Sequence, residues 1–426
     1  MAVYLKNAHF IDWETLAFKK GVNIKAEEGA GGGISFVEQV PSGAGDTVLD
    51  CAGKYVTKSF VCGHHHVYSA LSRGMNTVKK APANFLEVLQ YVWWALDKCL
   101  DLKSIEASAL VTAIACAKNG VTFCIDHHAS PNAIPGSLEV IAKAFDKVGV
   151  GHLLCYEITD RDGLGKAKEG LEETERYISG GGQGLVGLHA SFTVGEDTLA
   201  KAVALAKKLG SGIHVHVAEG TLDQEDSQAK YGMRVVERLK KAGALDFPKT
   251  ILGHCLHLDE KERALLKESP VWLVQNAESN MNNNVGAFNW NGLGPNMMFG
   301  TDGMHSDMIR SAKIAFFKNQ ENGGIGYDGF YTRFRNAHRY LSANGFTGDG
   351  ANNLVVLAYD PPTDFADYSF VGHVLFGLDS CYVESVVSQG KLIVRDRKML
   401  TVDEREAAAF AREEADKLWD RMRKAP

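Results

Sequence analysis

Histidines recur directly after short apolar runs of this 426-residue chain, which contains 15 His. His64 and His66 lie in VCGHHH, and His216 lies in IHVHVAEG with Glu219 three residues later. Side chains of a strand alternate between its faces, so His64 and His66 point to the same side. Two imidazoles placed in this way can share a metal ion, although solvated histidines at a polar strand end would give the same short motif.

Two more residues of this kind follow later apolar runs. His254 lies in LGHCLHLD and Asp302 in GTDGMHSD. A set made of His64, His66, His216 and Asp302 is rich in nitrogen and contains no Cys, which suits Zn²⁺ and also Fe²⁺ or Mn²⁺. His214, by contrast, is interpreted as a hydrogen-bonded core histidine. We therefore expect a divalent metal ion, with zinc first among the three metals.

Glu219 has a different expected task. It lies beyond the end of its apolar run, where it can lean over the metal group. A carboxylate beside a metal-bound water can take a proton from that water and pass it to the leaving group, which is what hydrolysis requires. These residues together predict a metal-dependent hydrolase.

The middle of the chain contains the elements that must bring these residues together. Apolar, strand-like runs occur at residues 55–62, 121–126, 150–158, 185–192, 212–217, 250–256, 271–276 and 297–301, and most are separated by helix-like segments. Alternation of this kind predicts an α/β fold, a TIM-like (β/α)8 barrel, in which active sites form at the C-terminal ends of the strands. A doubly wound open sheet is the alternative, but no G-x-G-x-x-G follows an early strand.

The two ends of the chain have a different texture. Short β-like runs separated by Gly-rich turns occupy the first fifty residues, and similar runs return near residue 354 before a closing helix. We expect both termini to build one small β-sandwich domain from residues 1–54 and 350–426, with the barrel formed by residues 55–349.

Composition excludes several classes of function. With 46 Lys+Arg against 52 Asp+Glu, the formal charge is -6, which argues against nucleic acid as a partner. No basic leader is followed by an apolar stretch, and no segment is apolar over the length of a bilayer, so we expect no membrane association. The eight Cys are scattered without a C-x-x-C pair, which favours reduced thiols and a cytoplasmic location.

The order H-x-H, H-x-A-E, G-H-C and G-T-D-G resembles the amidohydrolase superfamily. More narrowly, the chain is similar to the aminohydrolase and chlorohydrolase branch that acts on cyclic amidines, and FLEVLQYVWWALDKCLD, IDHHASPNAIPGSLEV and CYEITDRDG are most similar to SsnA-type aminohydrolases. The resemblance covers nearly the whole chain. One departure is that family members usually carry Pro-Gly where this chain has Lys58-Ser59.

The resemblance implies roles for individual residues. His64, His66, His216 and Asp302 would bind the metal, Glu219 would shuttle protons, and His254 would orient or help deprotonate the attacking water. Binuclear members carry a carboxylated Lys at the end of strand four, where this chain has His189 and no Lys, so one metal ion is implied. His189 would contact the substrate ring, and Asn280 matches a family position after strand seven. A dimer or larger homo-oligomer is common in the family.

Other residues are candidates for the wall of the pocket. His127, His128 and Arg161 end the second and third strand-like runs, and Trp93 or Trp94 could form an aromatic wall for a flat ring, although a helix core explains at least one of them equally well.

We expect hydrolytic deamination of an aminopurine, a pterin or a triazine, because an amine leaves only with the help of an acid such as Glu219, whereas a halide does not need one. A hydrolytic dechlorinase, a binuclear cyclic amidohydrolase and a non-catalytic metal-binding accessory protein are the alternatives.

Overall fold

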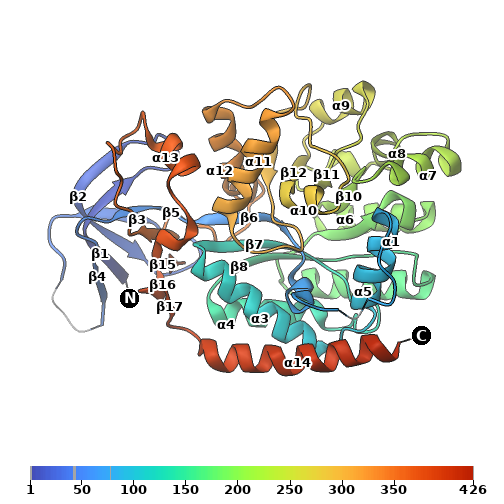
Figure 1. Cartoon of the computed structure of the whole chain (residues 1–426), viewed down its shortest axis with the longest axis horizontal. Helices are drawn as coiled ribbons and strands as arrows, with labels where there is room; N and C mark the ends of the chain where they lie inside the picture. Colours follow the sequence, from blue (N-terminus) through green and yellow to red (C-terminus); the bar gives the residue numbers. More distant parts are fainter. Residues whose placement is uncertain (1, 42–44, 77, 426) are drawn as a thin grey trace.

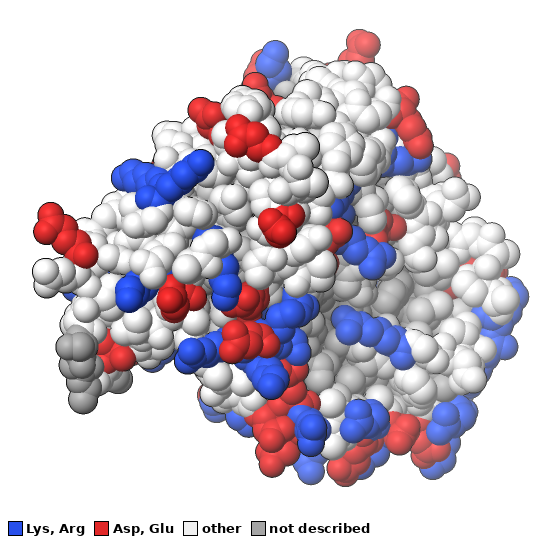
Figure 2. Space-filling view, turned by 60° about the vertical axis from the view of Figure 1, so that its left-hand side comes forward, with Lys and Arg blue, Asp and Glu red and all other residues white. Residues whose placement is uncertain are grey.

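The computed structural model describes residues 2–41, 45–76 and 78–425. It consists of a parallel α/β barrel and a β-rich domain at one side of it (Figure 1). Within the described residues, no helix combines the length and apolar character that crossing a bilayer requires. Acidic and basic side chains alternate over the face drawn in Figure 2, without a large patch of one sign.

The barrel strands occur where the apolar runs predicted them. They are β6 (Phe60–His65), β7 (Val121–His128), β8 (Gly151–Tyr156), β9 (Val186–Ala190), β10 (Ile213–Val217), β11 (Ile251–His254), β12 (Trp272–Gln275) and β13 (Met297–Phe299). Strands β6 to β8 form one parallel sheet and β9 to β13 another. Isolated parallel bridges join the two sheets at both seams, at Leu154 with Gly184 and Ile158 with Leu188, and at His65 with Asp302. The TIM-like architecture is therefore confirmed.

Helices cover the outside of the strands (Figure 1). They are α3 (Leu102–Lys118), α4 (Ser137–Val148), α5 (Leu164–Ser179), α6 (Glu196–Leu209), α7 (Thr221–Tyr231), α8 (Val235–Ala242), α9 (Glu260–Lys267), α10 (Ala277–Asn282), α11 (Met308–Gln320) and α12 (Tyr327–Ala343). Asp101 begins α3 with a capping box that includes Ser104, and α6 ends at Gly210, whose φ of 58° is unfavourable for residues with a Cβ.

The barrel interior is apolar below the site. Phe123 and Ile125 of β7 pack in one buried cluster with Val274 of β12 and Tyr340 of α12. On β10 the intervening residues Val215 and Val217 belong instead to the large cluster between strands and helices. Because side chains alternate along a strand, one set faces the barrel interior, which is polar near the site, and the other set packs against the outer helices.

The β-rich domain is built from both ends of the chain. Its strands are β1 (Ala2–Ile11), β2 (Phe18–Glu27), β3 (Ile34–Val37), β4 (Thr47–Asp50), β5 (Tyr55–Lys58), β14 (Leu354–Leu357), β15 (Val383–Ser388), β16 (Lys391–Arg395) and β17 (Lys398–Met399). β5 pairs with β1 and with β14. Helix α13 (Phe370–Phe376) precedes β15, and α14 (Glu404–Lys424) is the expected closing helix, which runs along the barrel below α3 and α4 (Figure 1).

The first expected strand, 55–62, is in fact two strands in different sheets. β5 belongs to the terminal sheet and β6 to the barrel, and Ser59 lies between them. Lys58 explains the break, because its ammonium forms a buried ion pair with Asp349 at 2.8 Å, and Arg335 donates to the carbonyl of Ser59 at 2.7 Å. We propose that the domain boundary lies at Ser59 rather than at residue 54.

Candidate metal centre and active site

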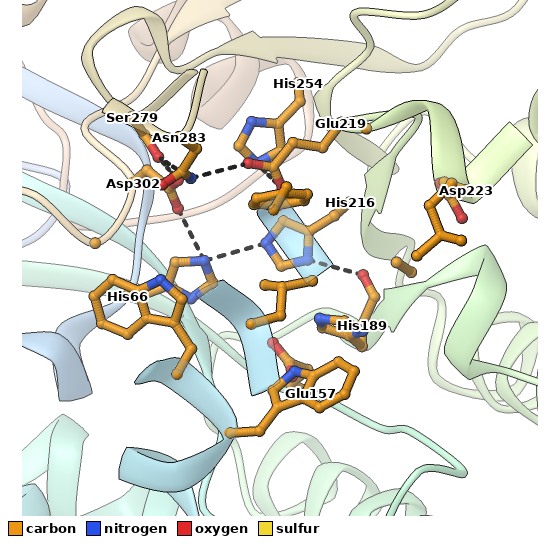
Figure 3. A pocket seen from close by; sticks show the side chains of 18 of the residues that line it. His66, Glu157, His189, His216, Glu219, Asp223, His254, Ser279, Asn283 and Asp302 are labelled. Atoms are coloured by element: carbon orange, nitrogen blue, oxygen red, sulfur yellow. Dashed lines mark hydrogen bonds and ion pairs between the residues drawn. The ribbon is translucent and has the colours of Figure 1, made fainter. Parts of the chain in front are cut away.

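Four side chains from three strand ends converge at the C-terminal mouth of the barrel. Nε2 of His66 lies 3.1 Å from Nε2 of His216 and 2.9 Å from Oδ1 of Asp302. Nε2 of His64 lies 3.3 Å from the same oxygen. The ligand atoms of the four residues all lie within 4.8 Å of one another, and Figure 3 shows His66, His216 and Asp302 pointing toward one another. The structure thus brings together the whole metal set expected from the sequence.

The opposite nitrogen of each histidine ring is fixed by a neighbour. Nδ1 of His66 contacts the carbonyl oxygen of His127 at 2.6 Å, Nδ1 of His216 contacts that of His189 at 2.8 Å, and Nδ1 of His64 contacts Nε2 of His214 at 2.9 Å. Such contacts orient a metal-binding imidazole and leave the lone pair of Nε2 for the cation. His214 is a buried supporting histidine, in agreement with its interpretation from the sequence.

The remaining atoms of the cluster fit a divalent cation. Within the described residues, Nε2 of His64 and Oδ1 of Asp302 are buried without a partner in hydrogen-bond geometry. Burial lowers the pKa of His64 to about 3, so its ring is neutral. Burial raises the pKa of Asp302, but its contacts with the rings of His64 and His66 outweigh burial and hold that pKa well below its usual range. Burial lowers the pKa of His66, but its contact with Asp302 outweighs burial and raises that pKa to about 9. A cation bound between these residues would take the place of this proton, leaving imidazole nitrogens and an ionised carboxylate as its donors.

Glu219 and His254 face each other beside this cluster. Their closest carboxylate oxygen and ring nitrogen are 3.6 Å apart, and with Asp302 they form a second group of ligand atoms within 4.8 Å. Burial and the charge of Asp302 raise the pKa of Glu219 well above its usual range, while burial lowers the pKa of His254 to about 4. A protonated acid and a neutral imidazole are thus held on one side of the metal group.

The backbone is strained at the same strand ends. Ala218, His254, Cys255 and Asp302 have φ values of 47°, 68°, 52° and 53°, in the left-handed region that residues with a Cβ rarely adopt. Strain of this kind is characteristic of functional sites, where the surrounding structure holds a side chain in a required direction.

Short helix α10 supports three of the site residues at once. Ser279 donates to Oδ2 of Asp302, Asn280 contacts Nδ1 of His254 at 2.8 Å, and Asn283, just beyond the helix, donates to Glu219 at 3.4 Å. The AESNMNN segment therefore orients the acid, the histidine and the metal-binding carboxylate together (Figure 3).

A cavity of about 880 Å³, including its mouth, opens over the cluster. One wall is a broken helical segment made of α1 (Phe85–Val88), a π-helical turn (Leu89–Trp93) and α2 (Trp94–Asp97). Phe85, Leu89, Trp93 and Trp94 of this segment line the cavity together with His189 and Phe192. A flat apolar ring can be enclosed by these groups with few polar contacts.

The expected substrate contacts divide into two groups. His189, Arg161 and Trp93 line the cavity, and so does Trp94. Asn280 and His128 are not among its lining residues. Asn280 acts on His254 as described above, and the ring of His128 is turned away to Ser130 at 2.9 Å, because alternate side chains of β7 face opposite sides. We therefore withdraw His128 as a substrate contact.

Three residues of the site were overlooked in the sequence. Glu157 follows β8 in CYEITD and lines the cavity, and the rule that functional residues end barrel strands would have included it. No sequence pattern of this kind points to Ser279 and Asn283, because their contacts to Asp302 and Glu219 join segments that are distant in the chain.

Comparisons with known proteins agree with this geometry. Residues 55–341 match the amidohydrolase family. The chain is 26% identical to a 5-methylthioadenosine/S-adenosylhomocysteine deaminase of Syntrophomonas wolfei, over 89% of this chain and 90% of the relative. It is 28% identical to a 5'-deoxyadenosine deaminase of Methanococcus maripaludis, over 86% and 89%.

Solved structures show the same fold. A zinc-bound adenosine deaminase from Xanthomonas campestris superposes with a TM-score of 0.81 at 17% identity, covering 98% of each chain. The zinc complex of an atrazine chlorohydrolase from Arthrobacter aurescens gives 0.79 at 13% identity, covering 97% of this chain and 100% of that one. The motifs, the barrel and the family match lead to one conclusion: this chain belongs to the amidohydrolase family.

Proposed function

We propose that the protein is a metal-dependent hydrolytic deaminase that releases ammonia from a cyclic amidine of the aminopurine, pterin or triazine type. The observation that carries this proposal is the position of Glu219, a half-buried acid 3.6 Å from His254 at the edge of the histidine and aspartate cluster. The names of the relatives, which are deaminases of adenosine derivatives, support it.

Each site residue has a part in the proposed reaction. His64, His66, His216 and Asp302 would hold one ion, for which zinc suits the donor set best and iron or manganese are alternatives. When bound, such an ion makes hydroxide available from water near neutral pH. His254 and Asp302 would orient the attacking water and accept the proton that it loses, while Glu219 gives a proton to the ring nitrogen. Glu219 would then take the proton of the added hydroxyl and pass it to the departing amine, and the proton held by His254 or Asp302 would restore Glu219.

The cavity supports a small heterocyclic substrate. Trp93 and Phe192 offer aromatic faces to a flat ring, and His189 and Arg161 offer polar groups at its edge. Assembly into a homo-oligomer stays a prediction of the family resemblance.

The test is an assay of ammonia release with the zinc-loaded protein on aminopurines, pterins and aminotriazines. Glu219→Gln should lower turnover at least about 100-fold, as expected for loss of a general acid, with the metal content unchanged. Glu225→Gln, which removes an exposed carboxylate from the following helix, should behave like the wild type. Equal turnover in Glu219→Gln would refute the role of the acid, and two ions per chain would favour a binuclear cyclic amidohydrolase instead.

A further inference from the structure

Two buried carboxylates that line the cavity have no task in the mechanism, Asp223 and Glu157. Asp223 accepts hydrogen bonds from two backbone N–H groups, which leaves Glu157. Glu157 follows β8, is 3% exposed and lines the cavity on the side of His189 (Figure 3). Its oxygens lie 3.3 Å from Nδ1 of His127 and 3.5 Å from a guanidinium nitrogen of Arg161. Both distances exceed the 2.7–2.9 Å typical of a charge-assisted hydrogen bond.

Arg161 does not form a close ion pair with Glu157, because its guanidinium is already paired with other carboxylates. Its guanidinium pairs closely with Asp97, and its Nε donates to Asp162 at 3.0 Å. Burial raises the pKa of Glu157, but the neighbouring ring of His189, the contact with His127 and the charge of Arg161 together outweigh burial and keep that pKa below its usual range. The result is an ionised carboxylate with acceptor capacity directed at the cavity.

His189 presents a second acceptor beside it. Its Nδ1 lies 2.6 Å from the hydroxyl of Thr193, and that hydroxyl donates to the carbonyl of Ala190 at 3.2 Å. Both contacts are satisfied when the hydroxyl accepts from Nδ1, which leaves Nε2 of His189 with a lone pair. A carboxylate oxygen of Glu157 and ring nitrogens of His189 and His216 lie within 4.8 Å of one another.

The atoms around Glu157 do not suit a second cation. It would require a ring nitrogen of His66 or His216 in addition to Glu157. Each of these rings already uses Nδ1 for a backbone carbonyl and Nε2 for the first cluster. An organic ligand with hydrogen-bond donors suits two adjacent acceptors better.

We propose that Glu157 is a substrate-binding residue that, with His189, selects heterocycles carrying paired N–H donors, as on a guanidine-type edge, next to the reacting amidine. This inference rests on the proposed deaminase function and names its substrate class. The proximity of Glu157 to His216 places the recognised donors on the heterocycle itself rather than on a distant substituent. Substrates whose ring lacks those donors leave the buried carboxylate unsatisfied and bind weakly.

The test compares ligands that differ in one amino group. Calorimetric titration of the zinc-loaded protein, made inactive by Glu219→Gln, would use 2,6-diaminopurine against adenine and 2,4-diamino-1,3,5-triazine against 2-amino-1,3,5-triazine. In at least one pair the diamino ligand should bind about 10- to 100-fold more tightly, as expected for a hydrogen bond to a charged group. Glu157→Gln, added to this protein, should remove most of that preference.

Asp162→Asn is the matched control, because it removes a carboxylate from the same cluster at a residue that does not line the cavity. It should keep the preference. Absence of a preference in both pairs, its persistence in Glu157→Gln, or equal loss in Asp162→Asn would overturn the proposal. Adenosine is titrated as well. The proposal would also be overturned if Glu157→Gln weakened the binding of adenosine relative to adenine and changed nothing else, because the carboxylate would then bind a ribose diol.

The two proposals can fail separately, because this readout is binding. Selective binding without ammonia release from any heterocycle would refute the deaminase and leave the role of Glu157 standing. Ammonia release without the Glu157-dependent preference would do the reverse.

Discussion

Asp349→Ala tests how the two domains are held together. Asp349 forms an ion pair with the ammonium of Lys58 at 2.8 Å and accepts a hydrogen bond from Nδ1 of His338 at 2.7 Å. The side chains of Lys58 and Asp349 are each 5% exposed. Lys58 ends β5 of the terminal sheet, while His338 belongs to α12 of the barrel. Removing the carboxylate leaves a buried cation without its counter-charge.

The expected loss of unfolding free energy can be estimated from these contacts. Removing one partner of a buried ion pair costs about 3–5 kcal/mol. Lys58 keeps two carbonyl acceptors, those of Asp349 and Gly350, so we expect a value near the lower limit, about 3 kcal/mol. Replacing both charges in Lys58→Met/Asp349→Leu should cost less than the single variant, because no uncompensated charge remains.

Urea denaturation followed by tryptophan fluorescence measures these differences. Asp379→Ala is the control, since it breaks an ion pair with Lys313 in which Asp379 is 62% exposed, and it should change stability by less than about 1 kcal/mol. The reasoning is refuted if Asp349→Ala costs no more than this control, or if the double variant is the less stable of the two.

Three further predictions concern acid, metal and the support of Asp302. Burial lowers the pKa of His338 to about 4 from 6.5. Between these values the unfolded chain binds more protons at this residue, so His338 alone should contribute a fall of about 3 kcal/mol in unfolding free energy from pH 7 to pH 4. His338→Gln should remove this contribution, measured by urea denaturation of both proteins at several pH values. Ser279→Ala removes a hydrogen bond to Asp302 and should weaken zinc binding about 10- to 100-fold, measured by competition with a chromophoric chelator; an unchanged affinity would contradict the support role. Removing zinc with a chelator should lower the midpoint of thermal unfolding, because an ion present at 1,000 times its Kd stabilises the fold by about 4 kcal/mol. Calorimetric scans with and without zinc measure this difference, and equal midpoints would contradict the prediction.

The barrel was predictable because each of its strands can be recognised locally. Runs such as VTFCI and GIHVHV are apolar over the length of a strand, and the segments between them have helical periodicity. The break between β5 and β6 was not predicted. Thr57, Lys58 and Ser59 interrupt the apolar run from residue 55 to residue 62, but three polar residues do not by themselves show that the two halves join different sheets. Pairing with β1 and β14, and the contacts of Lys58 and Arg335, separate it.

The candidate metal ligands could be predicted from the sequence, whereas the residues that support them could not. His64, His66, His216 and Asp302 could be found because strand ends of a barrel meet at one face, so position along each strand was sufficient. Ser279 and Asn283 act through hydrogen bonds to residues 23 and 64 positions away. Such contacts leave no periodic pattern in the sequence.

The sequence by itself determined the family and the parallel barrel and indicated the candidate metal ligands, because these follow from strand-length apolar runs and from residue types at their ends. Only the tertiary structure showed which side chains support these ligands by hydrogen bonds and which charged groups line the cavity. The ring of His128 turns to Ser130, while Glu157 lines the cavity at 3.3 Å from His127 and 3.5 Å from Arg161. Burial and hydrogen-bond partners of both residues depend on neighbours from distant segments.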